Sequence, residues 1–103
     1  MDELILLYNE EGTKYTPTLC GLRSVGHTEF YEAYANELRP EMKFVLADFL
    51  AYRGEPFVEH DRKLYRVLRT YRTGQEIELT VGRASAEEEN HCVAFKEYKH
   101  YYD

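Results

Sequence analysis

The chain has 103 residues, of which 44% are hydrophobic and 31% charged, and its formal net charge is −6. This length suits one domain with a core of its own, and the composition excludes a disordered chain. The negative charge excludes a general attraction to the nucleic-acid backbone, but not a local basic patch. Two cysteines without a close-spaced partner, no leader and no apolar run near about 18 residues indicate a cytosolic, thiol-reduced protein without a membrane segment.

The chain begins with a predicted hairpin. An apolar run at residues 4–8 ends in the sequence NEEG, in which asparagine and glycine tolerate the positive φ of a reversal. The return strand is predicted over about residues 16–25. Pro17 lies near its start, where a missing amide donor is tolerated.

A short helix is predicted next, as an insertion at about residues 27–39 between the second and third strands. Thr28 can cap this helix, and apolar residues recur at three-and-four spacing from residue 30 to residue 38. Pro40 ends it, because proline lacks an amide donor and disfavours the α conformation in the preceding residue. A helix of about ten residues is unstable alone and needs a surface to pack against.

Four more strands are predicted at short intervals. The strand that starts at residue 41 has apolar side chains on both faces, which indicates an interior strand. Strands at 57–60, 63–72 and 76–81 follow, separated by tight turns at Asp61-Arg62 and Thr73-Gly74. We therefore predict an all-β domain over residues 1–82, a small antiparallel β-barrel of about six strands or a sandwich. Residues 83–103 form a C-terminal extension, for which the pattern does not decide between strand and helix.

No group of residues predicts catalysis. The four histidines lack the spacing of a zinc site, and the carboxylates form no pair in an apolar setting. Cys92 follows His91, but adjacent residues of a strand point to opposite faces, so the imidazole could not readily take the thiol proton. We expect a protein that is not an enzyme and has no metal or cofactor.

A basic segment with interleaved tyrosines, RKLYRVLRTYR, covers residues 62–72. Strand alternation predicts that Arg66 and Arg72 share one face, and that Arg69 shares the other with Tyr65 and Tyr71. Such a strand could stack single-stranded nucleic acid, form a protein contact, or be a solvated face paired with glutamates, among them Glu59, on neighbouring strands. We favour the paired solvated face.

Several motifs together resemble a known family. They are RSVGHTEFYEA, RPEMKF, a GE turn, YRVLRTYR and IELTV, in this order from residue 23 to residue 81. In this pattern the chain is similar to the small head-tail joining proteins of tailed bacteriophages and prophages, also called head-tail adaptors, head-closure proteins or stoppers. It departs from many relatives at Asp61-Arg62, where they carry asparagine or aspartate with glycine, and in its C-terminal extension of about twenty residues.

The resemblance implies a β-barrel that forms a homo-oligomeric ring in the neck of the virion, after assembly in the bacterial cytoplasm. The ring would lie below the portal and its adaptor, close the channel after DNA packaging and dock the tail-side protein. Packaged double-stranded DNA would make only passing, sequence-independent contact. The segment that would reach the channel holds the closure candidates His27, Glu29, Glu32, Asn36, Glu37 and Arg39. The candidates for subunit interfaces are Arg62, Lys63, Tyr65, Arg66, Arg69, Tyr71, Arg72, Glu76 and Glu78. The alternatives are a nucleic-acid-binding barrel that uses residues 62–72 and a tail-completion protein.

Overall fold

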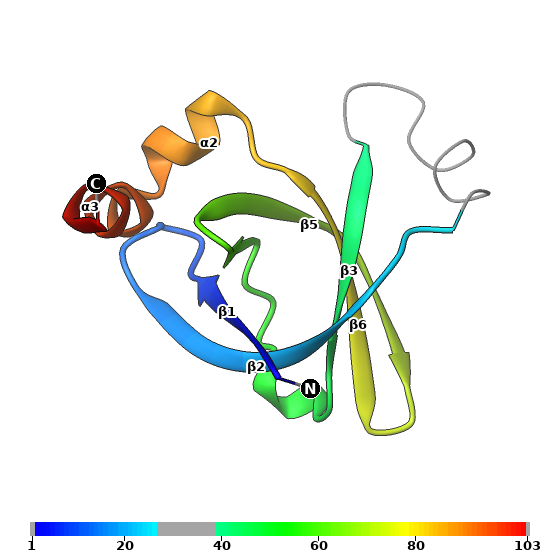
Figure 1. The fold of residues 1–103 in the computed structure, drawn as a ribbon. Coiled ribbons are helices and arrows are strands. Elements are labelled where there is room, and N and C mark those ends of the chain that lie inside the picture. The colour runs from blue at the N-terminus through cyan, green and yellow to red at the C-terminus, as the bar shows by residue number, and fades with distance from the viewer. Residues whose placement is uncertain (1, 27–38, 103) are drawn as a thin grey trace.

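The chain folds into a closed β-barrel with two helices at its C-terminal end (Figure 1). The structure is a computed structural model that describes residues 2–26 and 39–102. Six antiparallel strands close in the order β1-β2-β3-β6-β5-β4, which confirms the predicted all-β antiparallel barrel. The strands are β1 (Glu3–Tyr8), β2 (Tyr15–Arg23), β3 (Pro40–Leu46), β4 (Phe57–His60), β5 (Lys63–Thr73) and β6 (Glu76–Arg83). A single 3₁₀ turn, η1 (Phe49–Ala51), lies between β3 and β4.

The helix predicted between β2 and β3 falls on residues 27–38, which lie outside the described residues. The prediction of a helical insertion is therefore not borne out. The α-helices that the structure describes follow the barrel instead: α2 (Ala86–His91) and α3 (Val93–Tyr102). The C-terminal extension, which the sequence pattern left undecided, is thus helical.

The turn between β4 and β5 is made by two residues that are not glycine. Asp61 and Arg62 have φ values of 52° and 66°, so both adopt the left-handed conformation of a primed hairpin turn. The predicted turn position is correct, although this sequence departs from the glycine that such turns favour. The turn between β5 and β6 uses Gly74, with φ of 61°.

The interior of the barrel is filled by alternate residues of all six strands. In β6, Ile77, Leu79 and Val81 face inward and alternate with Glu76 and Glu78, which face outward. The other buried members of the interior cluster are Ile5, Leu7, Cys20, Phe44, Leu46, Val58 and Tyr65. This cluster is the main hydrophobic core.

A second apolar cluster lies outside the barrel wall, beneath the C-terminal helices. In β1, Leu6 and Tyr8 alternate with the interior residues and point outward, yet both are buried. Their covering partners include Cys92 and Phe95 from the helical end of the chain. The helices α2 and α3 therefore cover one outer flank of the barrel, which Figure 1 shows beside β1 and β5. We call α2 and α3 together the helical cap.

Candidate interaction surfaces

The outer wall formed by β2, β3, β6 and β5 carries a network of charges. Glu78 accepts from Arg23, with Nη1 and Oε2 3.0 Å apart, and lies 3.4 Å from Lys43 Nζ. Arg23 also lies 3.9 Å from Glu76. Arg69 and Tyr71 of β5 extend the same face, since they are opposite Thr80 and Glu78 of β6. We call this set the charged wall: Arg23, Lys43, Arg69, Tyr71, Glu76 and Glu78.

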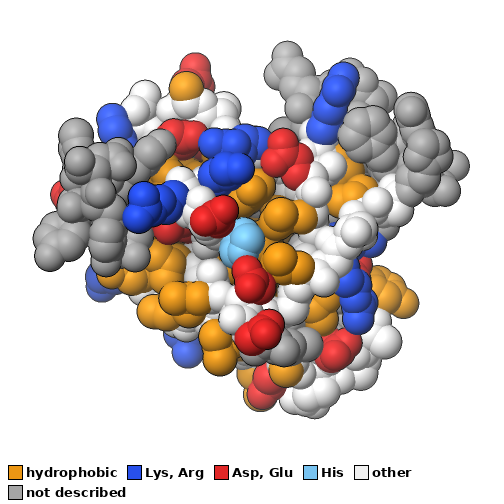
Figure 2. Space-filling view, viewed as in Figure 1, with side chains coloured by type: hydrophobic (Ala, Val, Ile, Leu, Met, Phe, Trp, Pro, Cys, Tyr) orange, Lys and Arg blue, Asp and Glu red, His pale blue; other side chains and the backbone are white. Residues whose placement is uncertain are grey.

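Much of the charged wall is available for contact. Side chains of two of its members, Arg23 and Glu76, are about half exposed, and Tyr71 is 64% exposed. An ion pair with two exposed partners, such as Arg23 with Glu76, contributes at most about 1 kcal/mol to folding. Lys43 and Glu78 lie deeper in the wall, with side chains that are 12% and 15% exposed. A hollow lined by Lys43, Arg69, Thr70, Tyr71 and Glu78 lies on the same wall. Figure 2 shows one face of the molecule, where acidic, basic and apolar side chains all reach the surface.

An apolar pair lies on the neighbouring part of the wall. Leu4 of β1 and Leu19 of β2 are directly opposite each other, and are 57% and 59% exposed. Single exposed leucines are ordinary, but two in cross-strand contact form a small apolar surface. We call these two residues the leucine pair.

The predicted grouping of the basic strand is wrong. Tyr65 and Val67 face the barrel interior, but the register shifts between Val67 and Arg69, so Leu68 is an extra residue in β5. A bulge of this kind exchanges the two faces of a strand for every residue after it. Arg69 and Tyr71 therefore share the outward face with Arg66, and Tyr65 lies on the other.

The structure distributes the other interface candidates along β5. Tyr65 is buried and meets Phe44 edge to face, with ring centroids 6.0 Å apart; burial raises its pKa above the ordinary value. Arg72 has the inward orientation at the barrel end, where its guanidinium lies 3.3 Å from the centre of the Phe49 ring. Arg62 and Lys63 are exposed at the β4–β5 turn. The arginines and tyrosines of residues 62–72 therefore do not form the single stacking surface that the nucleic-acid alternative requires.

Glutamates of the outer wall do pair with basic residues of nearby strands, but these residues are not the predicted ones of β5. Glu78 is opposite Tyr71 in register, but its ion pairs join it to Arg23 and Lys43 on β2 and β3. Glu59 accepts a hydrogen bond from Tyr8 of β1. It is 6% exposed, on the flank beneath the helical cap.

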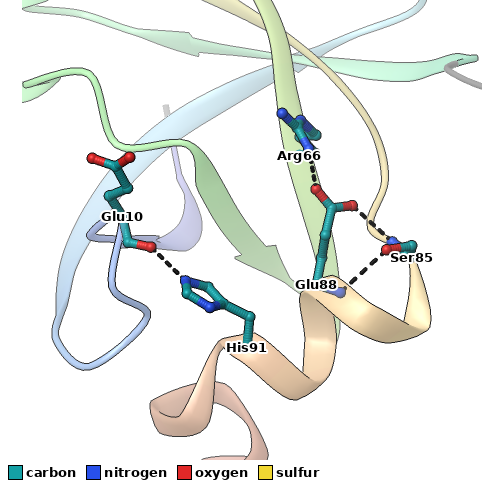
Figure 3. Close-up of polar contacts among 5 residues, drawn as sticks. All are labelled: Glu10, Arg66, Ser85, Glu88 and His91. Atoms are coloured by element: carbon teal, nitrogen blue, oxygen red, sulfur yellow. Dashed lines mark hydrogen bonds and ion pairs between the residues drawn. The ribbon is translucent and has the colours of Figure 1, made fainter.

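Arg66 connects the barrel to the helical cap (Figure 3). Its guanidinium forms an ion pair with Glu88, the third residue of α2. Glu88 also accepts from the Ser85 backbone N–H at 2.9 Å, and Ser85 Oγ accepts from the Glu88 N–H at 3.1 Å, which completes a capping box. Burial alone would raise the pKa of Glu88, but its bonds to Ser85 and Arg66 hold that pKa below the ordinary value.

A hydrogen bond between two buried side chains lies under the helical cap. Tyr8 donates to Glu59 Oε1 over 2.9 Å. Burial is the largest cause of a raised pKa for both groups; the adjacent Glu59 carboxylate raises that of Tyr8 further, while the hydrogen bond from Tyr8 partly offsets the shift of Glu59. A carboxyl group is therefore held in a largely apolar contact between barrel and cap.

The closure candidates are described only at Arg39, which is exposed. The carbonyl oxygen of Arg39 lies so close to Gly82 that a Cβ on Gly82 would come within 2.5 Å of it. His27, Glu29, Glu32, Asn36 and Glu37 lie outside the described residues. Among residues 2–26 and 39–102, no helix has the length and apolarity to cross a membrane, and no group of His, Cys, Asp or Glu could hold a metal ion.

The sequence analysis missed the residues that extend the charged wall across β2 and β3. Arg23 and Lys43 are isolated in the sequence, and only the register of β2 with β3 brings them together with Glu78. Nothing in the sequence distinguishes Leu4 and Leu19 from other apolar strand residues. Their outward orientation follows from the alternation of β1, but their exposure depends on which flank the helical cap covers.

We compared the chain with family models, curated proteins and solved structures, and found no significant match to any of them.

Proposed function

We propose that this protein is a structural component of the joint between the head and the tail of a tailed bacteriophage or prophage. It would act without catalysis, as one subunit of a ring below the portal and its adaptor. The ring would close the channel after DNA packaging and present the surface to which the tail-side protein binds.

One observation carries the proposal. The sequence pattern that resembles head-tail joining proteins runs from residue 23 to residue 81. This range extends from the last residue of β2 through β3, β4, β5 and most of β6. The small antiparallel barrel that the resemblance implies agrees with the closed barrel of the structure. Three motifs that are weak one by one therefore lie on neighbouring strands of the sheet: RPEMKF on β3, IELTV on β6 and YRVLRTYR on β5.

The surface of the barrel supports the same proposal. Subunits of a ring meet head to tail, so each must carry two different and complementary surfaces. The charged wall carries charges of both signs and adjoins the exposed leucine pair, so this side of the barrel could form one of the two contacts; charge complementarity would fix the orientation of a neighbour more than its affinity. The nucleic-acid alternative has less support, because Tyr65 is buried and Arg66 is bound to Glu88.

Electron microscopy of particles assembled without this protein tests the proposal. We expect filled or leaking heads without tails, and tailed particles again when the intact chain is supplied in trans. Full, tailed particles in its absence would refute a joining role. Full heads that retain their DNA beside unattached tails would favour tail completion over head closure.

A further inference from the structure

Two apolar clusters divide the molecule into a barrel and a helical cap. The barrel wall separates them, because neighbouring residues of β1 point to opposite sides: Ile5 and Leu7 inward, Leu6 and Tyr8 outward. The cluster under the cap consists of Leu6, Tyr8, Phe57, Leu64, Ala84, Cys92 and Phe95. Its contacts could be lost without exposing the interior of the barrel.

Among the side chains of the cap that the structure describes, Phe95 is an aromatic anchor on this flank. Phe95 is 1% exposed and meets Tyr8 edge to face, with ring centroids 6.3 Å apart. Cys92 is fully buried beside it. Val93, which follows Cys92, is nearly half exposed and so lies on the outer side of α3.

Polar contacts hold the rim of the cap (Figure 3). His91 Nε2 lies 2.7 Å from the carbonyl oxygen of Glu10, and the Ala94 N–H donates to the Gly12 carbonyl over 3.0 Å. The ion pair of Arg66 with Glu88 is partly exposed and contributes at most about 1 kcal/mol. These contacts orient the cap without adding much to its stability.

The cap also covers a group that water would stabilise. Glu59 lies under it with Tyr8 as hydrogen-bond donor. The titratable or charged groups on the elements around it are Tyr8 on β1, Tyr15 on β2, Arg66 on β5, and Cys92 and Glu88 on the cap side. Opening of the cap would hydrate the Glu59 carboxylate. The free energy gained by this hydration would offset part of the free energy lost with the apolar contacts.

We propose that the helical cap opens as a unit while the barrel stays closed, and that the flank beneath it binds an amphipathic helix of a partner protein. The cap already shows what this flank accepts: an aromatic side chain in the place of Phe95, a main-chain donor to Gly12, and a carboxylate for Arg66. A partner helix with this pattern would replace the cap. This inference goes beyond the head-tail joining role and does not depend on it.

The two cysteines allow a direct test, since each reports on one cluster. Cys20 lies in the barrel interior and Cys92 under the cap; both are fully buried, and burial raises the pKa of each to about 11. Neither thiol should react until its cluster opens. With an alkylating reagent on the full chain in native buffer, followed by mass spectrometry, we expect Cys92 to react at least about tenfold faster than Cys20. Equal rates would overturn the proposal, because cap and barrel would then open only together.

Loss of the anchor should open the cap selectively. Phe95→Ala should speed the labelling of Cys92 by about tenfold or more and leave that of Cys20 unchanged. Val93→Ala, at an exposed position of the same helix, is the matched control and should change neither rate. Phe95→Leu gives a milder loss should the alanine variant fail to fold. An equal increase at both cysteines would overturn the proposal.

A peptide of residues 83–103 tests the binding surface in trans. A fluorescent form, kept under reducing conditions, should bind the full-length Phe95→Ala chain at least about tenfold more tightly than the wild-type chain, whose own cap competes. The same peptide with Phe95→Ala is the control and should not bind. If the intact peptide fails to bind a variant whose Cys92 labels fast, the flank is not a helix-binding surface.

Discussion

Tyr8 of β1 donates its hydroxyl hydrogen to Glu59 of the neighbouring strand β4, under the helical cap. The hydroxyl oxygen and the carboxylate Oε1 are 2.9 Å apart. Leu6, not Tyr8, is opposite Glu59 in register, so the bond is diagonal and uses the length of the tyrosine side chain. The bond gives a buried acid a partner but no counter-ion. The pH dependence of stability should therefore report on this pair.

Replacement of Glu59 by glutamine should remove a loss of folding stability that grows as pH rises. Burial raises the pKa of Glu59 above its ordinary 4.5, so the folded state binds more protons than the unfolded state at pH values between the two pKa values. The contribution of Glu59 to stability is thus present in full below the ordinary pKa and is lost as pH rises through the folded pKa.

Denaturant unfolding of wild type and Glu59→Gln at several pH values checks this. The variant should gain stability relative to wild type as pH rises from about 4 to about 8, since glutamine stays neutral and can still accept from Tyr8. The lowered pKa of Glu88 acts in the opposite direction, because the contribution of Glu88 to stability is lost when pH falls. This contribution is the same in wild type and variant, so it cancels in their difference. A difference that does not change with pH would contradict the prediction.

Gly12 should be needed for its lack of a side chain as well as for its backbone conformation. It has φ of 72°, and a Cβ there would lie 2.6 Å from Cys92 Cα and 2.8 Å from the His91 carbonyl oxygen. Gly74 has a similar φ of 61° and open space around it. Gly74→Ala should therefore show the backbone cost alone, about 1–2 kcal/mol.

Gly12→Ala should lose a further 1–3 kcal/mol, roughly the cost of an overpacked contact, because the cap must move away from the β1–β2 turn. Free energies of unfolding of the two variants give the comparison. Equal losses would show that the turn and the junction of α2 with α3 are not in close contact.

Much of the barrel could be predicted because its signals are local. The alternation of Ile77, Leu79 and Val81 with polar residues indicates the faces of β6, and the turn at residues 61–62 was placed correctly. The turn predicted at residues 73–74 lies one residue too early, because Thr73 still pairs with Glu76 and the turn is Gly74-Gln75. The faces of β5 could not be predicted beyond Val67. The bulge at Leu68 is set by how β5 pairs with β6, which is a long-range property that residues 62–72 do not contain.

The helical cap was beyond sequence reasoning for a similar reason. Leu6 and Tyr8 form a continuous apolar run with Ile5 and Leu7. Such a run indicates that both faces of the strand are buried, but it does not show what covers the outer face. The capping box of Ser85 and Glu88 was a usable signal for the start of α2. Arg66 in turn looked like part of a basic platform, because its partner lies in a segment whose structure the pattern left open.

Ser85→Ala should weaken the start of α2. The Ser85 hydroxyl oxygen accepts from the Glu88 N–H, and loss of such a cap costs about 1 kcal/mol. The free energy of unfolding should fall by about this amount, and the labelling of Cys92 should increase. Ser85→Asp retains an acceptor and should stay close to wild type. If both variants lose the same stability, the hydroxyl is not acting as the cap.

The leucine pair should matter for assembly and not for folding. Because Leu4 and Leu19 are more than half exposed, changing both to threonine, which suits a strand, should alter the free energy of unfolding by less than about 0.5 kcal/mol. Complementation of particles that lack the protein should nevertheless fail, since a ring contact would lose its apolar part. Leu50→Thr is the matched control: Leu50 is 66% exposed, but lies on η1 and not on β1 or β2, and should complement fully. Normal tailed particles from the double variant would exclude the leucine pair as a subunit interface and leave the charged wall as the surface to change next.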